Sequence, residues 1–402
     1  MLELVCGLNN FTMDESQKGS GMKVVVWVVI AVLVVWGVYA LANKTPVQKA
    51  VVETGPIKIG VMVPLTGDFA VAGEPAQNIY KLAVKEINDA GGVNGRPLEL
   101  VTEDSKCNGE GGANAAQKLI NVDRVQLIIG GICSGETIPA VSIAETNKVV
   151  IISPAASSPA LTGMSHFFVR NYPGDSAQGK VLADIAYNKL GLKNMYILNE
   201  QTDYAQGIAK VVESTFSGLG GKVTREEFPT ATTDLRQLVT KAKAANPDAF
   251  VVNTQAPATA QKIFKVMRDL KWSPKLFTND ANPGDPPTMS LYRDVLNGAY
   301  VAEIGTDPSN PIFKHALDLY KSTYNSEMPF QSYGQTEWDV LFIVRDGIKA
   351  VGYNGPKLAD WLHSSVKDWQ GASGSVTIGA DGDPLVGHRA EVIKDGKTEV
   401  LK

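Results

Sequence analysis

The chain has 402 residues, of which 44% are hydrophobic and 20% are charged, as is ordinary for globular domains. Its length predicts two domains once an N-terminal leader is set aside. The net charge of −4, without a basic stripe, argues against nucleic acid as a partner. Three cysteines are too few for a disulfide-scaffold protein, although two of them can pair in an oxidising compartment.

The N-terminal part divides into three segments. Residues 1–23 are polar, residues 24–42 form an uncharged apolar run, and residues 43–56 form a linker. The apolar run is just long enough to span a bilayer. It is predicted to be either an uncleaved transmembrane signal-anchor or, if translation starts at Met22, a signal peptide cleaved after Ala42. Both alternatives predict that the rest of the chain is exported.

From Ile57 onward, apolar runs of strand length alternate with helical patterns. The first series has strands at 57–64, 96–104, 125–130, 149–153 and 166–170, with helices at 73–90, 113–121 and after 135. After a break at 173–175, a second series has strands at 195–199, 222–228, 249–253, 275–278 and 299–304, with helices at 176–190, 204–216, 235–245, 258–270 and 291–296. Near-continuous apolar strands joined by helices predict an α/β fold whose parallel sheets are covered on both faces. Helices at 311–324, 333–351 and 359–366 and a strand at 376–378 complete the chain.

Two turns of the first series carry small and hydroxyl residues. One is Gly131–Gly135 with Ser134, and the other is Pro154–Pro159 with Ser157. Ser158 before Pro159 is a helix-start signal, because its hydroxyl can cap the first turn. Both turns are predicted at the carboxyl ends of neighbouring parallel strands. They are either ordinary tight turns or, together, a neutral anion site suited to a carboxylate.

No set of residues in the sequence predicts catalysis or a metal site. The four histidines have no metal-ligand spacing, and no nucleophile or nucleotide-binding motif is present. Residues 109–112 (GEGG) are interpreted as a loop before a helix, and residues 381–383 (DGD) as a hairpin turn rather than a calcium loop. The sequence therefore predicts a protein that is not an enzyme, has no catalytic residues and needs no cofactor.

Cys107 and Cys133 follow successive predicted strands of the first series. They are either two free buried thiols or a disulfide at the carboxyl edge of one sheet. Because the chain is predicted to be exported, we expect the disulfide. Closing this loop would stabilise the fold by roughly 3–4 kcal/mol on the entropic account.

The motifs together resemble a known family. The matching segments are IKIGVMVPLTGDFAVAGEPAQN from Ile57, AVKEINDAGGVNGRPLELVTEDSKC from Ala83, IIGGICSGETIPAVSIAE from Ile128 and ISPAASSPALT from Ile152, continued by HFFVRNYPGDSAQGK and NPDAFVVNTQAPATA. They are similar to class I periplasmic binding proteins, in particular the leucine/isoleucine/valine-binding branch of ABC-transporter receptors. The resemblance implies two Rossmann-like lobes joined by a three-crossing hinge near Tyr172, Glu303 and Ser373. It implies a first lobe of residues 57–172 and 304–372, and a second lobe of residues 173–303 and 373–402. A cysteine pair matching Cys107 and Cys133 also occurs in the family.

The resemblance also implies a ligand site in the interlobe cleft. The carboxylate of the ligand would meet the two turns of the first lobe, at Ser134, Ala155, Ala156 and Ser157. The second lobe would contribute Tyr204 and an acidic residue, Asp280, for the ligand ammonium. Two positions depart from the family pattern, because Ala72 and Gln255 stand where many amino-acid binders have tyrosine. This departure implies a roomier or more polar pocket.

The function implied by the resemblance is that of an extracytoplasmic solute receptor. It would bind an amino acid or a similar small zwitterion, close on it, and deliver it to ABC permease and ATPase subunits. The alternative is a membrane-tethered sensory ectodomain of the same fold that feeds a signalling partner.

Overall fold

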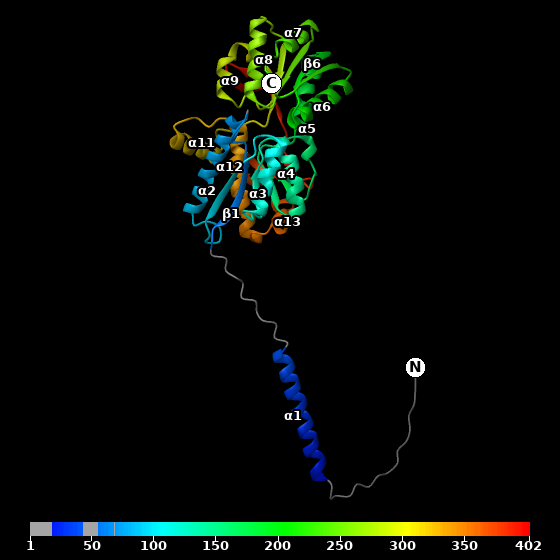
Figure 1. Ribbon diagram of the computed structural model, residues 1–402, viewed down its shortest axis with the longest axis vertical. Coiled ribbons are helices and arrows are strands. Elements are labelled where there is room, and N and C mark those ends of the chain that lie inside the picture. Colours follow the sequence, from blue (N-terminus) through cyan, green and yellow to red (C-terminus); the bar gives the residue numbers. More distant parts are fainter. Residues whose placement is uncertain (1–17, 43–54, 68) are drawn as a thin grey trace, which may run out of the picture. The chain divides into compact units, whose positions relative to one another are not determined.

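The computed structural model describes residues 18–42, 55–67 and 69–402. The chain divides into two units at Thr54/Gly55, and each is described by itself. In the first unit, α1 (Lys18–Ala42) is a continuous helix (Figure 1). No helix among the described residues is both long enough and apolar enough to qualify as a bilayer span. Anchoring through residues 24–42 therefore stays a prediction, and the predicted linker lies mostly outside the described residues.

The second unit contains two sheets, each with its own helices, which we call the first and second lobes. The first lobe is built on a five-stranded sheet of order β2-β1-β3-β4-β5, and every pairing in it is parallel. Its strands are β1 (Ile57–Val63), β2 (Leu98–Asp104), β3 (Leu127–Gly130), β4 (Val150–Ser153) and β5 (Phe168–Arg170). The predicted apolar runs form these strands, because alternate side chains enter the two cores on either face.

Helices cover both faces of the first sheet (Figure 1). One face packs against α2 (Ala70–Asp89), α11 (Pro311–Tyr324), α12 (Gln331–Val351) and α13 (Gly355–Ser365). The other face packs against α3 (Gly109–Asn121) and α4 (Ser134–Asn147). The predicted two-sided α/β layering of this lobe is confirmed.

The second lobe has a seven-stranded sheet of order β14-β13-β10-β9-β8-β6-β7. Its parallel strands are β6 (Asn194–Glu200), β7 (Lys222–Phe228), β8 (Ala249–Asn253), β9 (Lys275–Thr278) and β10 (Tyr300–Glu303). Two unpredicted strands, β13 (Arg389–Lys394) and β14 (Lys397–Val400), add an antiparallel edge. Helices α5 (Asp175–Asp184), continued by a π-helical turn (Ile185–Lys189), and α6 (Asp203–Gly218) cover one face. Helices α7 (Arg236–Ala244), α8 (Pro257–Asp269), α9 (Pro286–Leu291) and α10 (Arg293–Leu296) cover the other.

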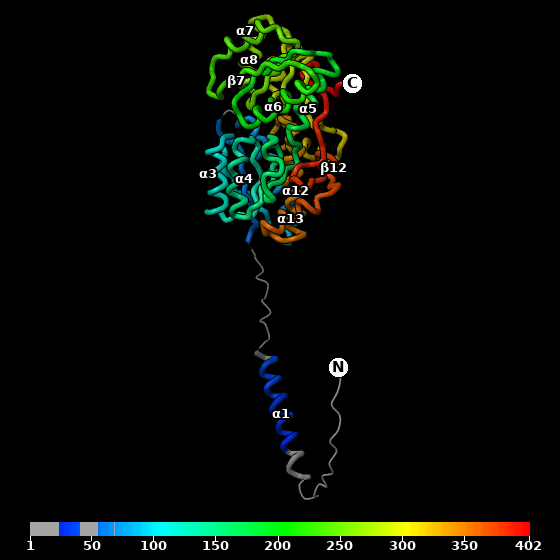
Figure 2. Tube along the Cα trace, turned by 90° about the vertical axis from the view of Figure 1, so that its right-hand side faces the viewer, coloured from blue at the N-terminus to red at the C-terminus, as the bar shows by residue number. Residues whose placement is uncertain are grey.

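Three connections join the lobes. The first follows β5 at Arg170, and the second follows β10 at Glu303. The third differs from the expected position near Ser373, because Val376 and Ile378 pack in the core of the first lobe. The chain pairs with the second sheet only from Arg389 onward. Figure 2 follows this last stretch as the red trace that passes from β12 to the C-terminus.

Several local predictions are refined by the structure. The GEGG segment is not a loop but the first turn of α3, because the side chain of Asn108 accepts a hydrogen bond from the backbone N–H of Gly111. Ser158 does cap a helix start, although the helix is a single 3₁₀ turn, η2 (Pro159–Leu161). The predicted strand at 376–378 is replaced by a hairpin of β11 (Trp369–Gly371) and β12 (Gly374–Val376). The DGD turn is confirmed, with Gly382 at a positive φ of 83°.

Candidate functional site

The two serine-bearing turns lie side by side, because β3 and β4 are paired in parallel. Helix α4 begins at Ser134, so its N-terminal dipole faces this edge of the sheet. The Ser134 hydroxyl oxygen accepts the backbone N–H of Ser158 at 3.0 Å. This bond ties one turn to the other and leaves the hydroxyl hydrogen of Ser134 able to donate.

The two alanines of the second turn contribute differently from the serines. The backbone N–H groups of Ala155 and Ala156 both point to the Ser153 hydroxyl oxygen, at 3.4 and 2.9 Å. The Ala156 side chain packs into the core of the first lobe. The Ala155 side chain instead joins an apolar cluster that includes Tyr172. Ala155 is therefore on the side of the turn that faces Tyr172, whereas Ala156 packs on the opposite side, in the core of the first lobe.

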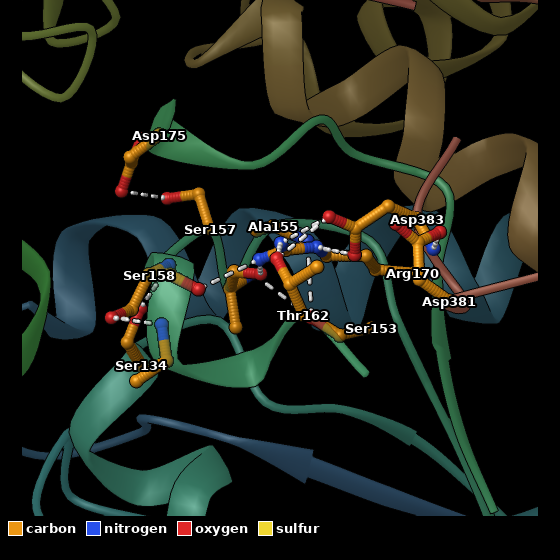
Figure 3. Close-up of polar contacts among 12 residues, drawn as sticks. Ser134, Ser153, Ala155, Ser157, Ser158, Thr162, Arg170, Asp175, Asp381 and Asp383 are labelled. Carbon is orange, nitrogen blue, oxygen red and sulfur yellow. Dashed lines mark hydrogen bonds and ion pairs between the residues drawn. The ribbon is translucent and has the colours of Figure 1, made fainter. Parts of the chain in front are cut away.

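Ser157 points away from Ser134 and toward the start of α5, as Figure 3 shows. Its hydroxyl donates to Asp175 Oδ2 at 2.9 Å, and its carbonyl accepts the backbone N–H of Asp175 at 2.8 Å. Asp175 was not predicted as a site residue. Its presence means that a buried carboxylate already occupies the hydroxyl expected to meet the ligand carboxylate.

Arg170, at the end of β5, holds the second turn in place. Its side chain is completely buried and makes a two-point ion pair with Asp383, with both N–O distances at 2.7 Å. It also donates to the carbonyls of Ala156 and Ser158 at 3.2 and 3.1 Å and to the hydroxyl of Thr162 at 2.8 Å (Figure 3). Every nitrogen of this guanidinium therefore has an acceptor.

A tyrosine cluster surrounds Asp280 directly after β9. Tyr172, on the first interlobe connection, donates to Asp280 Oδ2 at 2.5 Å, and Tyr204 of α6 donates to Oδ1. The hydroxyl of Tyr333, in the first turns of α12, bonds the same carboxylate. Burial, followed by the charge of Asp280, holds the pKa of all three phenols well above the usual value. The phenols therefore stay protonated, and each can donate a hydrogen to Asp280.

Two further carboxylates lie within electrostatic range of Asp280. Burial raises the pKa of Asp175 and of Glu303 well above the usual carboxyl value, and the Asp280 charge is the next contribution to both. His388 completes the group, because Gln178 lies between its ring and Asp175. Burial lowers the pKa of His388 to about 4, so the imidazole is neutral at pH 7. The cluster is thus a group of three carboxyl groups and a neutral imidazole, with no lysine or arginine among these residues.

The two departures from the family pattern lie at different places. Ala72, in the first turn of α2, is buried in the apolar cluster that also contains Ala155, Tyr172 and Tyr333. Gln255 follows β8 and donates its backbone N–H to Glu200 at 2.6 Å. The Gln255 side chain is nine-tenths buried. Neither residue carries a charge that could offset the carboxylates.

The structure brings together most of the predicted site residues. Tyr204 and Asp280 are in direct contact, and Ser157 bonds Asp175, which lies within electrostatic range of Asp280. Ser134 lies behind Ser157, in contact with the N–H of Ser158. Sequence reasoning did not name six of these residues as part of the site, namely Tyr172, Asp175, Gln178, Glu303, Tyr333 and His388. The predicted hinge positions already included Tyr172 and Glu303, and the break at 173–175 marked Asp175, whereas the other three carried no signal.

The disulfide between Cys107 and Cys133 is confirmed, with the two Cα atoms 5.3 Å apart. It joins the turn after β2 to the residue that precedes α4. Together with Glu136, these cysteines are the only His, Cys, Asp or Glu group spaced for a metal among the described residues. Because the two sulfurs are bonded to each other, they are not available as thiolate ligands.

Comparison with known proteins agrees with this architecture. The periplasmic binding protein family model matches residues 56–391. A leucine-, isoleucine-, valine-, threonine- and alanine-binding protein of Pseudomonas aeruginosa is 26% identical over 314 residues, 77% of this chain and 82% of that protein. An amino acid binding protein of the same organism is 26% identical over 82% of this chain and 88% of its own length.

Solved structures show the same fold. The leucine binding protein LivK of Thermotoga maritima has a TM-score of 0.79 and 26% identity, covering 86% of this chain and 98% of that one. The substrate binding protein LivJ of Streptococcus pneumoniae, solved with isoleucine, has a TM-score of 0.76 and 27% identity, covering 86% and 99%. The two-lobed α/β architecture and the family match over 56–391 lead to one conclusion: the chain belongs to the periplasmic binding proteins.

Proposed function

We propose that this protein is the extracytoplasmic solute receptor of an ABC importer and that it binds an amino acid or a similar small zwitterion between its lobes. The observation that carries the proposal is Asp280, a buried carboxylate whose partners are neutral phenols. An ammonium group is the natural replacement for one or more of these phenol donors. An ammonium would give Asp280 a partner of opposite charge, whereas in each phenol contact only the carboxylate is charged.

The opposite end of the ligand would be met by the first lobe. A carboxylate placed at the N-terminus of α4 would gain from the helix dipole and from the hydroxyl hydrogen of Ser134. Since Asp280 and Tyr204 belong to the second lobe, a ligand that touches both sides holds the lobes together. The proposal therefore assigns the cleft to binding rather than to catalysis.

The relatives support the same ligand class at a coarse level. Two of them are described as binders of branched-chain or other amino acids, and one was solved with isoleucine. The small side chain of Ala72 and the polar side chain of Gln255 favour a ligand that is larger or more polar than leucine. Delivery to permease and ATPase subunits is part of the proposal, as is location outside the cytoplasm.

The test begins with a thermal-shift screen of amino acids and small amines, because a ligand that binds only the folded state raises the melting temperature. Calorimetry then compares the wild type with Asp280→Ala, using the best ligand of the screen. Loss of a charge-assisted contact should weaken binding by at least about tenfold. The control is Asp318→Ala, which removes an exposed carboxylate of α11. Equal affinities for wild type and Asp280→Ala would remove Asp280 from the site.

Membrane retention is a separate part of the proposal. N-terminal sequencing of the mature protein distinguishes the two alternatives for residues 24–42. A new N-terminus at Asn43 would indicate cleavage, and an intact segment would indicate retention.

A further inference from the structure

A cavity of about 600 Å³ lies beside the candidate site, between the second lobe and the segment that leads into α12. Its polar wall includes Glu303 at the end of β10, Ser332 of α12, and Arg389 and Glu391 of β13. The ring of Phe330 forms part of its apolar wall. A volume of this size is typical of a pocket that takes a small molecule.

Glu303 is the residue that connects this cavity with the cluster around Asp280. Glu303 lines the cavity, yet the residue as a whole is only 5% exposed. Its Oε2 atom is buried and has no hydrogen-bond partner within the described part of the chain. The charge of Asp280 is close enough to raise the pKa of Glu303, after burial itself, so the two carboxylates share one electrostatic environment.

Of the two buried carboxyl groups that line the cavity, Glu391 has an ion pair and Glu303 has none within the residues that the structure describes. Arg389 pairs with Glu391 at 2.5 Å, so this carboxylate has its own cation. Lys397 also lines the cavity but is exposed. Among the described residues, no lysine or arginine forms a salt bridge with Glu303. Arg389 lies opposite Glu303 in the paired strands and its charge acts to lower the pKa of Glu303, but its ion pair is with Glu391, so one cation serves two carboxyl groups. A buried carboxylate without an ion pair of its own is costly to keep ionised, and a cation brought by a ligand would reduce that cost.

We propose that the ligand carries a second basic group, and that this group enters the cavity and pairs with Glu303 while the first ammonium meets Asp280. The ligand class that fits is an amino acid with a basic side chain. This inference rests on the proposed function, because it takes Asp280 as the partner of the first ammonium. It adds a specificity residue, Glu303, and the chemical class of the side chain.

The test compares two probes that share the amino-acid head and the aliphatic chain. L-Lysine carries a terminal ammonium that L-norleucine lacks. Calorimetry at pH 7 on the full-length protein should show L-lysine binding at least about tenfold more tightly than L-norleucine, because a charge-assisted contact is made by lysine alone. In Glu303→Gln the preference should disappear through weaker binding of lysine, with norleucine nearly unchanged. Glu399→Gln, an exposed acid of the same lobe, is the matched control.

The calorimetry results separate failure of this inference from failure of the proposed function. Norleucine binding as tightly as lysine to the wild type would overturn the inference and leave the proposed function intact. A Glu303→Gln variant that keeps the preference would also overturn it. If neither probe binds, both the inference and its assignment of Asp280 fail. The melting temperature of Glu303→Gln is measured in parallel, and if that variant does not fold, the wild-type comparison of the two probes decides.

Discussion

Two buried polar regions lie near the first connection between the lobes, and they differ in how their charges are matched. Around Arg170, one cation has a carboxylate, two carbonyls and a hydroxyl as acceptors, and its guanidinium is fully used. Around Asp280, two further carboxyl groups, Asp175 and Glu303, lie within electrostatic range of it, and the group is met by phenols, hydroxyls and amides. The first region is complete as it stands. The second has three carboxyl groups and, in the part of the chain that the structure describes, no ion pair of its own, so a cationic group brought by a ligand would find acceptors there.

Removing Arg170 from the first region should cause the largest loss of unfolding free energy. Arg170→Met leaves the carboxylate of Asp383, which is only 18% exposed, without its cation. Removal of one partner from a buried pair costs about 3–5 kcal/mol of unfolding free energy. Chemical denaturation measures this loss. Arg293→Met, which breaks an exposed pair with Asp395, should cost under about 1 kcal/mol. A comparably small loss for Arg170→Met would contradict the account of that region.

The disulfide stabilises the same side of the molecule by a covalent link. Replacing Cys107 and Cys133 together by alanine releases a loop with a sequence separation of 26 residues. The expected loss is about 3 kcal/mol, since the unfolded chain regains the entropy of the open loop. Denaturation of the wild type with and without a reductant gives an independent measure. Two alkylatable thiols in the native exported protein would show that the bond does not form.

Contact between the lobes can be tested without touching either charged region. A β-carbon on Gly207 of α6 would lie 2.7 Å from Cδ of Pro159 in the first lobe. Gly207→Ala should therefore hinder this approach and weaken ligand binding by about tenfold, equivalent to about 1.4 kcal/mol. The free protein should keep its stability, because alanine favours the helix.

The matched control is Gly218→Ala in the same helix, where a β-carbon meets nothing within 4 Å. Small-angle scattering with saturating ligand would show whether the lobes still come together. Unchanged affinity in Gly207→Ala would mean that this contact is not needed in the bound state.

The smallest effect is expected from replacing one buried carboxyl group of the second region, Asp175. The pKa of Asp175 is raised, mainly by burial, so its folded form holds the proton more tightly than the unfolded chain does. Its contribution to stability is therefore present below the ordinary carboxyl pKa and is lost as the pH rises through the raised value. Asp175→Asn should leave stability nearly unchanged at pH 4 and raise it by about 1 kcal/mol at pH 8. Asp184→Asn, which replaces an exposed acid of α5, is the matched control.

Features formed by residues close together in the sequence could be predicted, whereas contacts between residues far apart in the sequence could not. The parallel strands in the middle of both sheets were predictable, because strands such as β3, β4 and β8 are short apolar runs buried on two faces. Strands β13 and β14 were not, since Arg389–Val400 mixes charged and apolar residues at an antiparallel edge. Ser134 and Ser157 could be placed from their positions after neighbouring strands. The pair Tyr172–Asp280 is separated by 108 residues and Arg170–Asp383 by 213, and no local pattern reports such contacts.

The pairing of Arg170 with Asp383 also has a mechanical consequence. Arg170 ends the last strand of the first lobe before the first connection, and Asp383 lies just before the third. The backbone N–H of Arg170 bonds the carbonyl of Gly382 at 2.9 Å, so two of the three connections leave the first lobe from one fixed place. A rigid body tethered by two neighbouring points resists translation far more than rotation. The pair therefore acts as a pivot, and the easiest relative movement of the lobes is a swing about it rather than a slide.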